Sequence, residues 1–88
     1  MQNKRTLKKR IRVICQELFT EAVAVSLYGS QDQRDRAEAL LYTIVKMEDN
    51  FTMRVCHPEP GMSAKAYYDD LREKFSAQAT EILDQLNA

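Results

Sequence analysis

The segment His57-Pro58-Glu59-Pro60-Gly61 holds both prolines and one of the two glycines of this 88-residue chain, and the other glycine is Gly29. Glycine and proline are the residues that interrupt helices, so these two places divide the chain into three uninterrupted stretches of about 25 residues. In each stretch the apolar residues recur at three- and four-residue steps, which predicts an amphipathic helix. We therefore expect helices over about residues 5–28, 31–55 and 63–86.

Each expected helix carries one apolar stripe that must meet the other two. The stripes are Leu7, Ile11, Ile14, Cys15, Leu18, Phe19, Ala22 and Val25; then Ala37, Leu40, Leu41, Ile44, Met47, Phe51 and Val55; then Ala64, Tyr68, Leu71, Phe75, Ala79, Ile82 and Leu86. Short connections make sequential helices antiparallel neighbours. The predicted fold is thus all-α, an up-down-up three-helix bundle of long antiparallel helices that forms a single domain over residues 1–88.

Local signals set the ends of these helices. Gly29 is expected to end the first helix in a left-handed conformation, and Ser30 to Gln33 matches the capping-box pattern for the second. Pro58 disfavours helical geometry in the residue before it, so the second helix should end near His57. Ser63 is expected to cap the third helix.

The composition is that of an ordered globular protein, with 44% apolar and 30% charged residues and a formal net charge of zero. No stretch approaches 18 uninterrupted apolar residues, and charged and polar residues such as Arg12 and Glu17 interrupt any secretory leader. We therefore expect a cytoplasmic protein without membrane contact. Cys15 and Cys56 are too few for a disulfide scaffold and wrongly spaced for zinc, so two free, buried thiols and neither metal nor cofactor are expected.

The second half of the first helix is apolar nearly all round, so a second apolar face is predicted behind its core stripe. The expected interaction surface consists of Val13, Val23, Ala24, Leu27, Tyr42 and Val45. Exposed apolar patches usually mark interaction sites, and twofold homodimers are the commonest oligomers. We expect a homodimer, with an unidentified protein as the alternative partner. Scattered surface apolar residues, or helices that tilt enough to bury them, would explain the same pattern.

Charge is segregated along the chain, because residues 1–12 carry six cations and no acid. Four of these cations would share one helix face and are the candidate contacts for a polyanion: Arg5, Lys8, Lys9 and Arg12. The topology also brings this basic end beside an acidic end made of Glu48, Asp49, Glu59, Asp69, Asp70 and Glu73. Pairing between the two ends, which would cancel the basic field, or plain solvation of the cations is the expected explanation, and no aromatic residues interleave with the cations. We therefore do not expect a nucleic-acid partner.

His57 is the only histidine and the one candidate for acid–base chemistry; it is flanked by Cys56, Pro58 and Glu59, and Asp70 is the other residue of the candidate site. A histidine at the end of a helix more often interacts with the last carbonyl groups, and this structural role is expected here. A small helical enzyme also needs cations that project into a pocket between helices, whereas those of the first helix are expected to flank its solvent side. The sequence thus predicts no catalytic residue.

Three segments together resemble a family of short bacterial all-helical proteins of unknown function. They are Lys8-Lys9-Arg10-Ile11 through Glu17-Leu18-Phe19-Thr20-Glu21-Ala22-Val23-Ala24, then His57-Pro58-Glu59-Pro60-Gly61-Met62, and Ala64-Lys65-Ala66-Tyr67-Tyr68. The resemblance implies a bacterial helical protein and no mechanism. The prediction is therefore a non-catalytic protein–protein interaction module that self-associates. A nucleic-acid-binding protein that uses the basic helix face, and a small helical enzyme with a site near His57, are the alternatives.

Overall fold

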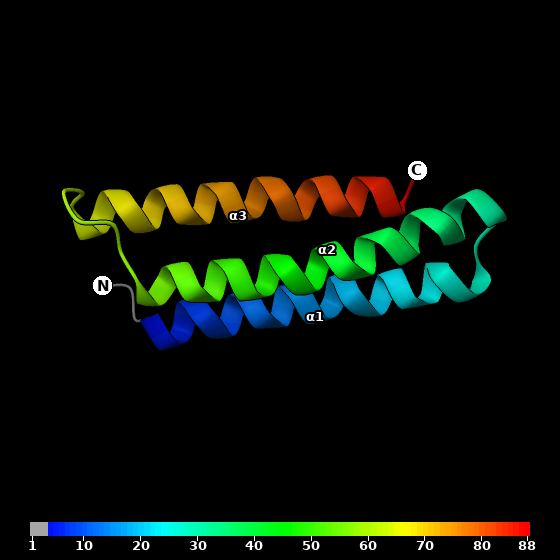
Figure 1. The fold of residues 1–88 in the computed structure, drawn as a ribbon, viewed down its shortest axis with the longest axis horizontal. Helices are drawn as coiled ribbons and strands as arrows, with labels where there is room; N and C mark the ends of the chain where they lie inside the picture. Colours follow the sequence, from blue (N-terminus) through cyan, green and yellow to red (C-terminus); the bar gives the residue numbers. More distant parts are fainter. Residues whose placement is uncertain (1–3) are drawn as a thin grey trace.

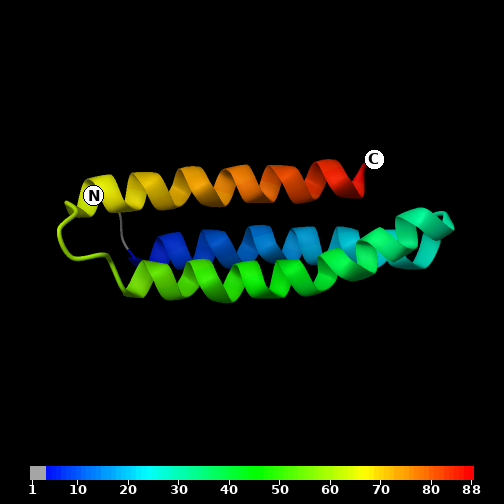
Figure 2. The ribbon, with the colours of Figure 1, turned by 45° about the horizontal axis from the view of Figure 1, so that its top comes forward.

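A computed structural model describes residues 4–88 and shows three helices: α1 (Lys4–Tyr28), α2 (Gln31–Cys56) and α3 (Ala64–Leu86). They run up, down and up along a rod of 47 × 18 × 17 Å (Figure 1). The predicted all-α three-helix bundle is confirmed, and each expected helix boundary lies within one residue of the observed one. Figure 2 shows α3 lying along one side of the hairpin that α1 and α2 form.

The α1–α2 connection contains the predicted capping box. The Ser30 Oγ accepts a hydrogen bond from the Gln33 backbone N–H at 3.4 Å, and the Gln33 Oε1 accepts one from the Ser30 N–H at 2.9 Å. The prediction that Gly29 is left-handed is wrong, because within residues 4–88 only Gly61 has a positive φ, of 93°. Gly29 is required for space instead: a Cβ there would lie 2.8 Å from the Val25 carbonyl oxygen.

The core lies between the three helices and consists of fifteen buried apolar residues. They are Leu7, Ile11, Cys15, Leu18, Ala22, Ala37, Leu40, Ile44, Met47, Phe51, Val55, Leu71, Phe75, Ile82 and Leu86. The antiparallel register places Ala22 opposite Ala37, and both are fully buried, so the small side chains let α1 and α2 approach closely near their turn. The rings of Phe51 and Phe75 meet edge to face at 5.2 Å and join α2 to α3.

Some residues of the predicted stripes lie outside this core. Ile14 is 38% exposed and Phe19 is 39% exposed, and Ala64 is also exposed. The reason is geometrical, because three- and four-residue steps define a stripe wider than the contact that one helix makes with two neighbours. Ile14 borders the groove between α1 and α3, whereas Phe19 borders the groove between α1 and α2. Both grooves therefore have apolar rims.

Candidate interaction surfaces

An apolar hollow lies between α1 and α2, on the side away from α3. It has a volume of about 350 Å³ and is lined only by residues of the hairpin: Cys15, Gln16, Phe19, Thr20, Ile44, Val45 and Glu48. Phe19 and Val45 rise on its two rims. Val23 lies one helical turn beyond Phe19, and Leu41 one turn before Val45, and both are half-buried. We call these four residues, Phe19, Val23, Leu41 and Val45, the α1–α2 face.

The residues predicted for the interaction surface are indeed at the surface, but they do not share one groove. Val13, Ala24, Leu27, Tyr42 and Val45 are exposed, and Val23 is half-buried. Tyr42 points about 60° away from Val45 around α2, because the two are three residues apart at about 3.6 residues per turn. It borders a separate hollow between α2 and α3, beside Lys46 and Met53. Sequence reasoning placed Phe19 and Leu41 in the core and so missed two members of the face.

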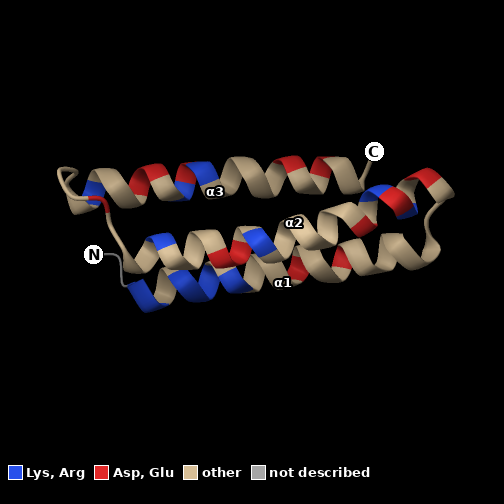
Figure 3. Ribbon diagram, viewed as in Figure 1, with Lys and Arg blue, Asp and Glu red and all other residues tan. Residues whose placement is uncertain are grey.

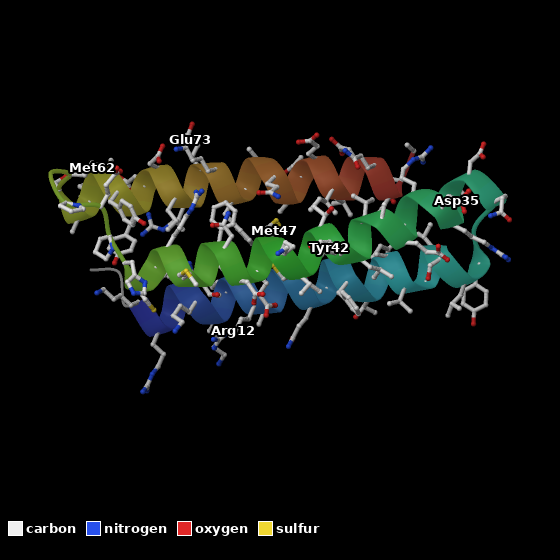
Figure 4. The ribbon with its side chains drawn as sticks, viewed as in Figure 1. Arg12, Asp35, Tyr42, Met47, Met62 and Glu73 are labelled. Carbon is white, nitrogen blue, oxygen red and sulfur yellow. The ribbon has the colours of Figure 1, made fainter. Side chains whose placement is uncertain are left out.

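The cations of α1 form a basic face on its first half (Figure 3). Lys8 is half-buried, whereas Arg5, Lys9 and Arg12 are exposed, and Figure 4 shows Arg12 pointing away from the bundle. Within the part of the chain that the structure describes, Lys8, Lys9 and Arg12 have no carboxylate within 4 Å. Of the two expected explanations, pairing with the acidic end is therefore wrong for these three cations, and plain solvation remains.

The acids of α3 pair instead with cations of their own helix. Asp69 binds Lys65 at 2.8 Å and Arg72 at 3.0 Å, and Asp70 binds Lys74 at 2.9 Å. The hydrogen bond from Lys65, assisted by Arg72, holds the pKa of the Asp69 carboxyl below its ordinary value. Residues three and four apart on a helix are neighbours, so these pairs form without tertiary contacts. Asp69 and Asp70 are therefore engaged by their own helix and not by Lys8, Lys9 or Arg12.

His57 has the structural role that its position predicts. Its ring Nδ1 lies 3.0 Å from the Met53 carbonyl oxygen, and because a carbonyl only accepts, the ring donates this hydrogen bond. The His57 backbone N–H donates to the Arg54 carbonyl at 3.3 Å. The ring thus satisfies one of the carbonyl groups left without a partner where α2 ends. No group of three or more metal-ligating side chains that could hold an ion occurs among residues 4–88.

Two tyrosines of α3 complete the cap of α2. The Tyr67 hydroxyl is 2.9 Å from the Arg54 carbonyl oxygen and 3.2 Å from that of His57. The Tyr68 hydroxyl donates to the Val55 carbonyl at 2.9 Å in a partly buried setting. Both rings pack against the core, and they meet each other edge to face at 5.3 Å. The predicted stripe of the third helix contained Tyr68 and not Tyr67, but both are half-buried, and their hydroxyls hold the end of α2.

The two cysteines differ in environment. Both are free, but Cys56 is exposed, so the expectation that both thiols are buried is wrong for Cys56. Burial, with the nearby charge of Glu48 adding to it, raises the pKa of the Cys15 thiol to about 11. The reactive form of a cysteine is the thiolate, so Cys15 is chemically inert at neutral pH. It acts as a small apolar side chain at the floor of the α1–α2 hollow.

Comparisons with known proteins do not indicate a function for this chain. No family model matches the chain, and neither a curated protein nor a solved structure matches it. The resemblance to bacterial helical proteins stays a prediction. Of the helices in residues 4–88, none has the length and continuous apolar character that crossing a membrane requires.

Proposed function

We propose that this protein is a non-catalytic interaction module that forms a twofold dimer through the α1–α2 face. The observation that carries the proposal is the hollow on the hairpin side opposite α3, where Phe19 and Val45 are 39% and 49% exposed. Burying large apolar side chains against a second copy removes this surface from water at about 25 cal/mol per Å². The twofold arrangement pairs the face with itself, so a single patch serves both partners.

The size of the hairpin side suits a dimer. Twenty-five residues of α1 at about 1.5 Å each give a length of about 37 Å. With the 18 Å width of the rod, each copy offers a projected area of about 670 Å², close to the roughly 800 Å² that each partner of a standard interface buries. The two hairpins would then form the central four helices of a six-helix assembly, with one α3 on each outer side.

Charge selects the direction of the twofold axis. Arg12 lies two turns before Phe19 and on the same side of α1, whereas Glu48 lines the hollow from α2. An axis parallel to the helices places α1 of one copy across from α2 of the other at the same level. Arg12 then approaches Glu48 of the second copy, which would give this cation an ion pair that it does not form within residues 4–88.

The mass in solution at high micromolar concentration tests this proposal. The wild-type protein is expected at twice the 10.2 kDa of the chain by light scattering coupled to size-exclusion chromatography. Val45→Asp should give a folded monomer. Leu83→Asp is the matched control, because Leu83 is 42% exposed but borders the α1–α3 groove, and it should remain a dimer. A wild-type monomer, or equal dissociation by both variants, would refute the assignment of the α1–α2 face.

A charge exchange tests the orientation separately. Arg12→Glu should weaken the dimer through repulsion from Glu48 of the second copy, and combining it with Glu48→Arg should restore the wild-type dissociation constant. The coupling is read from a double-mutant cycle in low salt. If the double variant is weaker than either single variant, the helices do not pair in this register.

Polyanion binding is a second candidate, favoured by the observation that Lys8, Lys9 and Arg12 keep their charge uncompensated among the described residues. Affinity for labelled duplex or single-stranded DNA should then fall steeply with salt concentration. It should be lost when the three cations become glutamine. Absence of salt-dependent binding in fluorescence anisotropy would eliminate this candidate and leave the dimer proposal untouched.

A further inference from the structure

A further, smaller cavity lies between the first halves of α1 and α3. Its volume is about 160 Å³. Its apolar walls are Leu7, Ile11, Ile14, Leu71 and Phe75, and its polar lining consists of Arg10, Arg72 and Ser76. An apolar hollow with a few convergent polar groups is the usual form of a small-molecule site.

The two arginines have unused hydrogen-bond donors. The Nη1 of Arg72 donates to Asp69 at 3.0 Å, but its Nε is buried and has no acceptor in the described chain. Buried polar groups are almost always hydrogen-bonded, so an orphaned guanidinium N–H beside a cavity indicates a missing acceptor. Arg10 is exposed and forms no ion pair within residues 4–88. Asp69 is shared between Lys65 and Arg72, and Arg10 and Arg72 are the charged residues among those that line the cavity.

Helix geometry explains why these groups converge. Arg10 lies three residues after Leu7 and four before Ile14, and Arg72 lies three residues before Phe75 and four before Ser76, so each arginine lies beside residues of its own helix that line the cavity. Arg10 therefore borders a space between helices, and the prediction that the cations of the first helix flank only its solvent side is wrong for this residue.

We infer that this cavity binds a small monocarboxylate whose body is a single aromatic ring or a short branched aliphatic chain. The planar fork of a guanidinium matches the two oxygens of a carboxylate, and two such groups at one cavity select an anion. The apolar walls select a ligand with an apolar body. The size limit follows from volume, because a cavity of about 150 Å³ lined by Leu, Ile and Phe holds one benzene ring.

The inference is independent of the dimer. Arg10 and Phe19 are nine residues apart, so they point in opposite directions from α1 at about 3.6 residues per turn. The cavity thus opens on the side of α1 away from the α1–α2 face, and no lining residue is shared by the two hollows. The remaining cations of α1 raise the positive potential near the cavity mouth and attract an anion in either oligomeric state.

Titration calorimetry and protein-detected NMR test the site with sodium benzoate and 3-methylbutanoate as probes. The expected Kd is about 1 mM, since ligands of about nine heavy atoms have low affinity at ordinary ligand efficiency. Benzamide, which has the same ring without the charge, and inorganic phosphate, which has the charge without the ring, should each bind at least tenfold more weakly. Equal binding of benzoate and benzamide, or of benzoate and phosphate, would overturn the inference.

Variants locate the binding. Arg10→Gln should weaken benzoate binding about tenfold, and Ser76→Leu, which fills the cavity without changing charge, should abolish it. Arg72→Lys keeps the charge but loses the planar fork, so it should also weaken binding. Lys74→Gln on the exposed side of α3 is the control and should bind as the wild type. Unchanged affinity in both Arg10→Gln and Ser76→Leu, with folding verified by circular dichroism, would show that the ligand binds elsewhere.

Discussion

Removal of a single hydroxyl from Tyr68 should lower the stability of the whole bundle. In Tyr68→Phe the ring still packs against the core, but the Val55 carbonyl loses the donor that lies 2.9 Å away in a partly buried setting. Val55 is fully buried, so water replaces this donor poorly. A buried polar group left without its partner costs about 1–3 kcal/mol, and we expect about 1.5 kcal/mol here.

Tyr67→Phe is the comparison that makes this magnitude informative. The Tyr67 hydroxyl makes two hydrogen bonds, with the carbonyls of Arg54 and His57, but both are exposed and water can replace them. The expected cost is below about 0.5 kcal/mol. If the number of hydrogen bonds decided the loss of stability, Tyr67→Phe would be the more destabilising variant, whereas burial predicts that Tyr68→Phe is.

Urea unfolding followed by circular dichroism measures both variants. The midpoint should fall with an unchanged m-value, and the melting temperature of Tyr68→Phe should fall by about 6–12 °C for a domain of this size. Protein concentration must be held constant, because self-association adds concentration-dependent stability. A larger loss in Tyr67→Phe than in Tyr68→Phe, or no loss in either, would refute the reasoning that these hydroxyls cap α2.

Two further predictions concern the glycines and the cysteines. Gly61→Ala should lower the free energy of unfolding, measured by thermal unfolding, by about 1–2 kcal/mol through left-handed strain alone, since no atom lies within 4 Å of the added Cβ. Gly29→Ala should lower it more, because the added Cβ would lie 2.8 Å from a carbonyl oxygen of α1. Native protein should react with one equivalent of thiol reagent, at Cys56, and unfolded protein with two. The folded-state pKa of Cys15 is raised from 9.0 to about 11. The contribution of the buried thiol to the free energy of unfolding is therefore complete below about pH 9 and is lost as the pH rises through 11. Relative to Cys15→Ala, the wild type should therefore lose about 2 kcal/mol of unfolding free energy across that range, and parallel pH profiles would contradict this.

The helices and their ends could be predicted because local chemistry determines them. Ser30 caps α2 with neighbours in its own sequence, and the prolines after His57 end that helix without any tertiary contact. Which apolar residues are buried depends instead on how the helices cross. Leu18 and Phe19 are adjacent and similarly apolar, yet Leu18 is 6% exposed and Phe19 is 39% exposed. Periodicity alone does not contain that difference.

The candidate sites were harder to predict because they join residues that are distant in sequence. Arg10 and Arg72 meet at one cavity only because α1 and α3 run parallel at a fixed register. Asp69 shows the opposite case, in which an expected contact between distant residues does not form, although the topology places this residue near the basic end of α1. Its own neighbours Lys65 and Arg72 reach it first, because side chains three and four residues apart on a helix meet at little entropic cost. Local pairing therefore prevailed over the predicted tertiary pairing.

The way in which α3 is attached bears on the three hollows that α3 borders, one with α2 and two with α1. At one end the tyrosines bind the last carbonyls of α2, and at the other end Arg36 donates to the carbonyls of Gln85 and Ala88 at 3.4 and 3.3 Å. Between these ends α3 contributes four buried apolar residues, fewer than α1 or α2. A helix fixed at both ends and packed sparsely between them leaves room on either side without losing its register. The cavity at Arg10 and Arg72 lies along the first half of α3, where Leu71 and Phe75, two of its four buried residues, form part of the apolar wall.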